Sequence, residues 1–448
     1  MHLLNAPSLW LSRVLPFHYV WVIVAALATA QMIGLAVGWA AGVLVTPLQD
    51  EFGFDIEDIG LSFGLFYLAA AVFAPIAGWL GDRYGARRVM VLSAALYIVT
   101  LLLVAFMDHL WSLHFSFGIL RGIAQVIFMV PLMAGVALWF NRRLGLGTGV
   151  LWAASGIGSA VFAPLMPFMV GNLGWQNTFL LICVVLGVSL LLLAIPLRNN
   201  PEEMGLKPYG WAPGDEARQR QRKSIEKIRL QVFNRHVRRT KAFWNLPCIH
   251  GLGCAGHGII MLFVVPLAVE DRGISLGTAA FTLTIISSVS IISRFVTPIL
   301  CERKGTKLVM ASCLLLQGVP VALLFWADSA WEFFLFSAIF GLGFGGEWTG
   351  YLVINRQYYG NGPMGMVYGW QNSGSLLAHA FVSWAAGMMV ALTGSYTAIL
   401  VFSLATSLGG AALVAALEPT SHRLIPANWE DDLPAEARTA PAIAMADD

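Results

Sequence analysis

Two arginines, Arg121 and Arg294, lie well inside long apolar stretches, whereas the other basic residues lie near the ends of such stretches or between them. A charge at the centre of a membrane costs about 2.5–3.5 kcal/mol even on the lenient insertion scale. Such a residue therefore faces a cavity or a partner. A guanidinium group binds a carboxylate through two parallel hydrogen bonds, so we expect Arg294 to bind an organic anion. The alternative is an ion pair with Glu347 that only holds the helices together.

Three polar residues are expected at the same depth as Arg294. At about 1.5 Å of rise per helical residue, Glu347, Gln371 and Asn372 lie, like Arg294, about 11–13 Å inside the membrane. A carboxyl group exchanges between a charged and a neutral form, so we expect Glu347 to be a proton-linked group. The two amides would offer neutral hydrogen bonds to a hydroxyl or keto group of the anion.

Other residues inside the apolar stretches are weaker candidates. His379 has a side chain that can titrate near neutral pH, and Trp348 and Tyr368 are candidates to line a cavity. For each of them, packing inside a helix bundle is the alternative. Cys254 and His257 are neighbouring potential metal ligands, but a structural zinc site takes four. We therefore expect no metal site and no cofactor.

The apolar stretches that position these residues dominate the chain. Of its 448 residues, 58% are hydrophobic and 12% are charged, against about 25% charged in ordinary soluble domains. This composition excludes disordered, disulfide-rich secreted and nearly all cytosolic proteins. A membrane-spanning helix needs about 20 apolar residues, and the stretches predict an all-α polytopic membrane protein with twelve of them: 18–46, 56–79, 88–107, 111–138, 146–170, 176–197, 245–268, 276–300, 307–327, 331–354, 364–391 and 395–417.

The charges of the connections predict which side each one faces. Lys and Arg gather in alternate connections, such as 80–88, 142–143 and 303–307, while the others are acidic. Basic loops stay in the cytoplasm, so both termini are expected there, in the inner membrane of the cell. The 46-residue connection 198–243 carries twelve Lys/Arg against five Asp/Glu, and we expect it to lie on the anionic membrane surface rather than to bind nucleic acid.

The two parts of the chain match each other at a constant offset of 220 residues. The matches include loop charges and turn glycines, and they predict two six-helix halves that face each other across an axis along the membrane normal. The expected organisation is a half at 1–197, the basic linker at 198–243, a second half at 244–417 and an acidic tail at 418–448, expected to be disordered. The matched pairs are Asp82–Glu302, Arg83–Arg303, Gly85–Gly305, Val89–Val309, Met90–Met310, Asp108–Asp328, Trp111–Trp331, Asn141–Asn361, Gly145–Gly365, Gly149–Gly369 and Ser155–Ser375.

Residues 78–88, GWLGDRYGARR, follow the second apolar stretch. Gly85 allows a tight turn, and Asp82 can meet a helix N-terminus or basic side chains. The pattern resembles the loop motif of the major facilitator superfamily, and the copy at 298–308, PILCERKGTKL, keeps an acid, a base and the glycine. The functional interpretation is a conformational latch, with anchoring of the topology as the alternative; its residues would be Gly78, Asp82, Arg83, Gly85, Arg87, Glu302, Arg303 and Gly305.

Longer stretches resemble the monocarboxylate porter and oxalate/formate exchanger branch of that superfamily. They are WFNRRLGLGTGVLWAASGIGS at 139–159, NLGW at 172–175, RNNPEEMGLKPYG at 198–210 and KAFW at 241–244. In that branch an arginine of the eighth span binds the substrate carboxylate, and its position matches Arg294. The aspartate that mammalian members carry four residues earlier is Ser290 here, which leaves the proton partner open. Span 11 has no lysine like that of the exchanger, which argues against a dianion.

A weaker resemblance concerns Arg121. The segment GILRGIAQ at 118–125 loosely resembles a second superfamily motif whose arginine is linked to proton coupling, although Gln125 replaces a later glycine of the motif. The resemblance implies a proton-coupling role for Arg121. An anchor inside the fourth span is the alternative.

These features together predict a secondary transporter rather than an enzyme. The leading interpretation is a monomeric carrier of a small organic monoanion, with a proton as co-substrate in symport, surrounded by lipids and working by alternating access. Two alternatives stay open: an exporter of drugs or metabolites, and a transporter-like sensor that signals without flux. The chain has no Walker loop, which argues against ATP-driven transport on one chain.

Overall fold

The computed structural model describes residues 6–34, 45–213, 215, 223–360, 362–426 and 429–438. Over these residues the chain is helical, and its only β pairing is an isolated bridge between Phe140 and Tyr209. Ten helices of the described chain are long and apolar enough to cross a membrane. The two other predicted spans correspond to the shorter helix α2 and to the α15–α16 segment. The prediction of an all-α polytopic membrane protein is confirmed.

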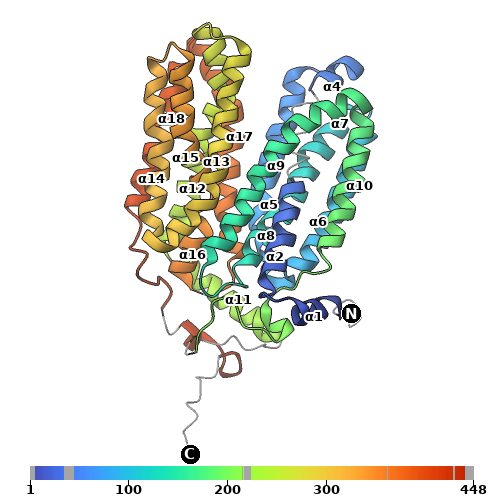
Figure 1. Ribbon diagram of the computed structural model, residues 1–448, viewed down its shortest axis with the longest axis vertical. Coiled ribbons are helices and arrows are strands. Elements are labelled where there is room, and N and C mark those ends of the chain that lie inside the picture. Colours follow the sequence, from blue (N-terminus) through green and yellow to red (C-terminus); the bar gives the residue numbers. More distant parts are fainter. Residues whose placement is uncertain are drawn as a thin grey trace, which may run out of the picture.

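The first half of the chain forms one bundle, drawn in blue to green in Figure 1. A short helix, α1 (Ala6–Val14), precedes it, and residues 35–44 of the first predicted span lie outside the described residues. Within the fourth span, a π-helical segment directly precedes Arg121. The elements are α2 (Val20–Gly34), α4 (Val45–Phe52), α5 (Ile56–Tyr84), α6 (Ala86–Ala105), α7 (Leu110–Leu113), η2 (His114–Leu120), α8 (Arg121–Val136), α9 (Leu144–Leu173) and α10 (Trp175–Leu193).

The second half forms the other bundle, drawn in yellow to red. The predicted span 331–354 is broken in the structure, because α15 ends at Glu347 and α16 begins at Tyr351. The elements are α12 (Lys241–Pro266), η4 (Leu267–Asp271), α13 (Leu276–Lys304), α14 (Thr306–Gly318), η5 (Val319–Phe325), α15 (Ala330–Glu347), α16 (Tyr351–Tyr359), α17 (Gly365–Thr393) and α18 (Thr397–Ala415).

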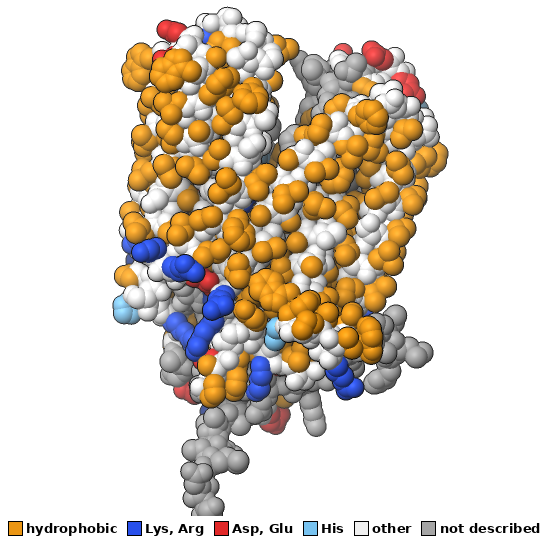
Figure 2. Space-filling model, viewed as in Figure 1, with side chains coloured by type: hydrophobic (Ala, Val, Ile, Leu, Met, Phe, Trp, Pro, Cys, Tyr) orange, Lys and Arg blue, Asp and Glu red, His pale blue; other side chains and the backbone are white. Residues whose placement is uncertain are grey.

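The two bundles stand side by side and diverge towards one end (Figure 1). At the other end, next to the linker helix α11 (Lys223–Arg238), they are in contact; we call it the linker end. The space-filling view shows hydrophobic side chains over the sides of both bundles, Lys and Arg gathered near the linker end, and a gap between the bundles at the opposite, open end (Figure 2). This surface is that of a protein embedded in lipid.

The 220-residue repeat is visible in the turns. Gly85 and Gly305 end the equivalent helices α5 and α13 with φ angles of 83° and 94°, a conformation that favours glycine because it has no Cβ. At Gly85, a Cβ would also lie 2.1 Å from the Asn199 side chain. A second pair at the same offset, Gly174 and Gly394, has φ angles of 77° and 61°. A glycine with a positive φ angle therefore ends the equivalent helices in both halves.

The linker and the tail contact each other, which differs from the expectation of a disordered tail. Residues 429–438 form two short 3-10 helices, η6 (Trp429–Asp432) and η7 (Ala435–Ala437), that pack against α11. Arg229 forms an ion pair with Glu430 and donates a 2.7 Å hydrogen bond to the carbonyl of Ala437. His236 contacts Asp432 at 2.9 Å. The basic linker and the acidic tail thus meet through side chains of opposite charge.

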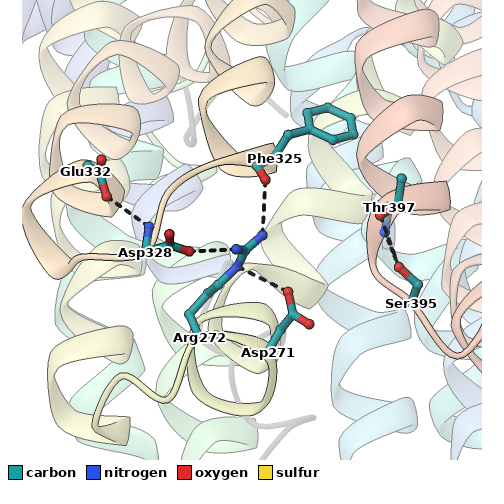
Figure 3. A network of polar contacts seen from close by, with 7 residues as sticks. All are labelled: Asp271, Arg272, Phe325, Asp328, Glu332, Ser395 and Thr397. Atoms are coloured by element: carbon teal, nitrogen blue, oxygen red, sulfur yellow. Dashed lines mark hydrogen bonds and ion pairs between the residues drawn. The ribbon is translucent and has the colours of Figure 1, made fainter.

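At the open end of the second bundle, Arg272 joins two turns (Figure 3). Its guanidinium contacts Asp328 at 2.7 Å and Asp271 at 3.1 Å, and it donates a 3.2 Å hydrogen bond to the carbonyl of Phe325. Glu332 accepts a bond from the backbone of Asp328 and thereby orders the start of α15. These contacts hold the α12–α13 turn against the turn before α15.

Candidate functional site

The bundles meet at the linker end through two equivalent helix crossings. In the first crossing, α5 packs against α17 so closely that a Cβ at Gly365 would lie 2.4 Å from the carbonyl oxygen of Gly78. One turn further along α17, a Cβ at Gly369 would lie 2.4 Å from the carbonyl oxygen of Ala74. Only glycine permits backbones to approach in this way. Gly78 thus has a packing role in the interface between the halves.

The second crossing repeats the first at the 220-residue offset. Here α9 packs against α13, and a Cβ at Gly145 would lie 2.2 Å from the carbonyl oxygen of Pro298. A Cβ at Gly149 would lie 2.6 Å from that of Phe295. The linker end is therefore closed by two pseudosymmetric helix contacts, one between α5 and α17 and one between α9 and α13.

A carboxylate reaches across each crossing to the N-terminus of a helix in the other half. Asp82 accepts 2.8 Å hydrogen bonds from the backbone N–H groups of Gly365 and Met366 at the start of α17. Its repeat partner Glu302 faces the backbone N–H groups at the start of α9, where its Oε2 would lie 3.0 Å from a Cβ at Gly145. Helix N-termini favour such anions. Both predicted latch acids thus bridge the two halves.

The other predicted latch residues lie around these carboxylates. The Arg83 guanidinium lies 5.1 Å from the ring centre of Trp79 and 5.4 Å from that of Tyr84. The backbone N–H of Arg87 donates to the Asn199 side chain at 3.4 Å. Arg303 lies in the last turn of α13. These residues lie at the linker end of each half, while Asp82, Glu302 and Gly78 form the contact between the halves.

We expect Gly369→Ala to open the linker end. The added methyl group must displace the backbone at Ala74, and overpacking of this kind costs about 1–3 kcal/mol, which corresponds to a shift of about 5–150-fold in a conformational equilibrium. Distances between spin labels on the linker ends of α5 and α17 would report the change. Gly387→Ala on the same helix is the matched control, because a Cβ there meets nothing within 4 Å. If the distances between the spin labels are the same in Gly369→Ala as in the wild type, the contact between Gly369 and Ala74 does not hold the linker end closed.

Arg294 lies at the interface between the halves, above the α9–α13 crossing. Its Nη1 donates a 2.8 Å hydrogen bond to Ser155 of α9, and its guanidinium lies 5.5 Å from the ring centre of Phe344. Its Nε is buried without a hydrogen-bond partner. Among the ion pairs of the described residues none involves Arg294, so the alternative of a structural pair with Glu347 is not observed.

Arg121 occupies a second buried position, at the start of α8. Its guanidinium lies between the rings of Phe66 and Phe117, at 4.2 and 4.5 Å from their centres. Its side chain is 4% exposed, and its Nε has no hydrogen-bond partner. The rings provide cation–π contacts, but no carboxylate in the described part of the chain pairs with this charge. Both intramembrane guanidinium groups therefore lack a protein counter-ion there.

Glu347 lies against α12 rather than against Arg294. Its Oε1 accepts a 2.9 Å hydrogen bond from Tyr351, and its Oε2 is buried without a partner. A Cβ at Gly253 would lie 2.6 Å from Oε1, so a glycine of α12 makes room for the carboxyl group. Glu347 and Arg294 therefore do not contact each other, although the sequence predicts the same depth for both.

The two predicted amides differ in what they can still bind. Gln371 exchanges two hydrogen bonds, of 2.8 and 2.9 Å, with Asn355, so both groups of its side-chain amide are engaged. Asn372 keeps a buried Nδ2 without a partner, and the Tyr368 hydroxyl is likewise unpartnered. Asn372 and Tyr368 are therefore the more available hydrogen-bonding groups of α17.

An aromatic cluster connects the halves beside Arg294. Trp348 lies 6.2 Å from Trp152 of α9, between ring centres, and 5.7 Å from His379 of α17. His379 in turn stacks on Tyr67 of α5 at 5.3 Å with an interplanar angle of 16°. The site therefore draws side chains from α5 and α9 of one half and from α13, α15 and α17 of the other.

Sequence reasoning did not assign roles to Ser155, Tyr67 and His250. Ser155 was noticed only as a repeat match, and its hydrogen bond to Arg294 depends on how the halves meet. His250 could have been found, because His250, Cys254 and His257 follow one another at intervals of four and three residues, which places them on one face of a helix. Tyr67 carries no comparable signal.

Comparisons with known proteins agree with this architecture. The sequence profile of the Major Facilitator Superfamily matches residues 27–383. Monocarboxylate transporter 12-B of Danio rerio is 23% identical over 407 residues, covering 84% of this chain and 82% of that protein. The uncharacterized MFS-type transporter YhjX of Escherichia coli is 24% identical over 315 residues, covering 70% of this chain and 74% of that protein.

A solved structure shares the fold. The crystal structure of the human organic anion transporter MFSD10 (TETRAN) superposes with a TM-score of 0.71 at 15% identity, covering 88% of this chain and 99% of that one. The fold predicted from the apolar stretches and the repeat is therefore confirmed.

Proposed function

The chain belongs to the Major Facilitator Superfamily, and from this premise we propose that it carries a small organic monoanion across the membrane by proton-coupled symport. That it is a transporter and not an enzyme follows from its relatives. The monocarboxylate class of the substrate is our proposal. It draws on the names of several relatives, among them monocarboxylate transporter 12-B.

The observation that carries the proposal is the unpaired guanidinium of Arg294 at the interface between the halves. A buried charge without a counter-ion is unfavourable in a medium of low dielectric constant. A carboxylate that binds Arg294 supplies the missing charge and satisfies its Nε. The single hydrogen bond to Ser155 leaves the other guanidinium N–H groups for the substrate, and Asn372 and Tyr368 would orient its remaining polar groups.

Glu347 is the proposed proton carrier. It is an acid of the membrane interior whose second oxygen has no partner among the described residues, and protonation would neutralise it. His379 and Arg121 are the further proposed coupling groups. His379 contacts both halves through Tyr67 and Trp348, so a change in its charge would act on their packing.

The direction of access follows from the charge of the loops. Basic connections favour the cytoplasmic side, and the basic end of the molecule is the closed linker end (Figure 2). We therefore propose that the structure is an outward-open state of a monomer in the inner membrane, with both termini in the cytoplasm. The Asp82 and Glu302 contacts would hold that state and break when the halves rock inward.

Reconstituted liposomes test this function directly. With an inward proton gradient, we expect saturable uptake of a radiolabelled monocarboxylate accompanied by acidification of the lumen. Dye efflux without carboxylate uptake would instead support the exporter alternative. An absence of flux for every carboxylate tested, from protein that shows ligand-induced thermal shifts, would support a sensor and overturn the proposal.

A further inference from the structure

The tertiary structure brings a distant histidine to possible metal ligands that are neighbours in the sequence. The thiol of Cys254 and one ring nitrogen each of His257 and His379 lie within 4.8 Å of one another. A second group of three, formed by His250, Cys254 and Glu347, shares the same sulfur and has the same upper separation. His379 comes from α17 and the other ligands of the first group come from α12.

The hydrogen bonds of the imidazoles determine which nitrogen is free. Nδ1 of His257 lies 3.3 Å from Oε1 of Gln317, and Nδ1 of His379 lies 2.9 Å from the carbonyl oxygen of Ser375. These oxygens only accept hydrogen bonds, so Nδ1 carries the proton in both rings and Nε2 keeps its lone pair. Metal-binding histidines are held in this way by an outer partner on the other nitrogen.

Burial adds an argument against a role in packing alone. His257 is 1% exposed and Cys254 is fully buried, and the Nε2 of His257 has no hydrogen-bond partner among the described residues. An unsatisfied buried polar atom costs about 1–3 kcal/mol. His379 lies beside it, with ring centres 5.5 Å apart.

The surroundings leave space for the ligands and orient them. Gly258 brings the α12 backbone close to His379, because a Cβ there would lie 3.9 Å from the Nε2 of His379. The Ser375 hydroxyl lies 3.0 Å from the Cys254 sulfur, while its carbonyl oxygen holds His379. Ser375 thus positions two of the three ligands. Gln317, which orients His257, is itself fixed by a 2.8 Å bond to the carbonyl of Gly253.

We propose that Cys254, His257 and His379 bind one transition-metal ion of the soft or borderline class, such as Zn²⁺. With bonds of about 2.3 Å to sulfur and about 2.0–2.1 Å to nitrogen, tetrahedral ligands stand about 3.3–3.7 Å apart. The observed upper limit of 4.8 Å therefore requires an adjustment of about 1.5 Å at most. Three protein ligands leave a fourth position open. A thiolate with two imidazoles selects ions such as Zn²⁺, Co²⁺ or Cu⁺ over Mg²⁺ and Ca²⁺.

The metal site adjoins the proposed carboxylate site and shares His379 with the proposed coupling groups, but it does not require Arg294. Its ligands lie on α12 and α17, whereas Arg294 lies on α13 and contacts α9. The ring of Trp348 lies 5.2 Å from that of His257 and 5.7 Å from that of His379, between ring centres. Since His379 stacks on Tyr67 of the other half, an ion held there would lie at the interface that opens and closes during transport.

Titration of the purified, metal-free protein with Co²⁺ tests the proposal. We expect one Co²⁺ per chain, a sulfur-to-cobalt charge-transfer band, displacement by Zn²⁺, and no competition from Mg²⁺. Cys254→Ser should lose the charge-transfer band, whereas Cys183→Ser, a matched control in the first half, should keep it. Ser375→Ala should weaken binding by about 10–100-fold, as is usual for the loss of an outer partner.

Size-exclusion profiles and thermal unfolding would establish that each variant is folded. If Cys254→Ser does not fold, Ser375→Ala provides a milder change that tests the same site. The proposal is overturned if wild-type protein binds no Co²⁺, or if a folded Cys254→Ser protein keeps the same band and affinity. If a metal-free Cys254→Ser protein still takes up carboxylate, transport does not require the metal site, and the two proposals can fail independently.

Discussion

Replacing Arg294 by glutamine is expected to abolish saturable carboxylate uptake while the protein still folds and reaches the membrane. The substitution removes the only guanidinium that we propose for direct contact with the substrate. Loss of one partner of a buried, hydrogen-bonded charge pair costs about 2–5 kcal/mol, which corresponds to a decrease in affinity of about 30–5000-fold. Binding measured by thermal shift and uptake measured in liposomes should fall together.

Two further variants make the Arg294 experiment specific. Arg294→Lys keeps the charge but loses the planar pair of donors, so it should recover only part of the affinity. Arg272→Gln is the matched control in the same half, because its guanidinium joins turns at the open end (Figure 3). Full uptake by Arg294→Gln, or an equal loss in Arg272→Gln, would refute the assignment of Arg294 to the substrate.

Replacing Glu347 by glutamine is expected to separate substrate movement from proton movement. Glutamine has nearly the same shape and keeps a hydrogen-bonding oxygen for Tyr351, but it cannot carry a proton across the membrane. In the wild type, a one-to-one symport with an inward gradient of one pH unit would support about tenfold accumulation. In Glu347→Gln we expect the accumulation to disappear while exchange of labelled for unlabelled substrate continues.

The measurement is uptake at fixed substrate concentration over a series of external pH values. Wild-type uptake should rise as the external pH falls, because protons are a co-substrate, whereas uptake by Glu347→Gln should be independent of pH. Glu270→Gln is a suitable control, since Glu270 accepts a hydrogen bond from Tyr396 in a turn at the open end. Persistent proton-driven accumulation in Glu347→Gln would move the coupling role to another residue, with His379 and Arg121 as the remaining proposals.

The fold could be predicted from the sequence because its signals are local and repeated. Apolar length determines whether a helix can cross a membrane, and the turn glycines recur at the 220-residue offset with positive φ angles in both halves. The break between Glu347 and Tyr351 was missed, because the apolar pattern runs through it. The contact of Arg229 with Glu430 was missed too, because composition alone does not say which charged segments meet.

The candidate site could be predicted only in part. The sequence alone was enough to identify Arg294 and Arg121 as charges inside the membrane that need a partner or a cavity, because a charge there is costly. Depth along a helix was also accessible, but the direction of a side chain around the helix was not. Glu347 and Arg294 were therefore placed at one depth, with an ion pair between them as an open alternative, whereas the structure places Glu347 against Gly253 and Arg294 against Ser155.

The sequence by itself determined that this protein spans the membrane repeatedly, that its two halves are copies, and that two charges must find partners inside it. Only the tertiary structure decided what those partners are. It joined Asp82 to the start of α17, left Arg294 without a carboxylate in the described chain, and brought His379 to Cys254 and His257. The physical reason is that apolar length and charge act within one helix, whereas a binding site needs side chains from several helices. Their meeting depends on how close-packed helices cross, which no single segment specifies.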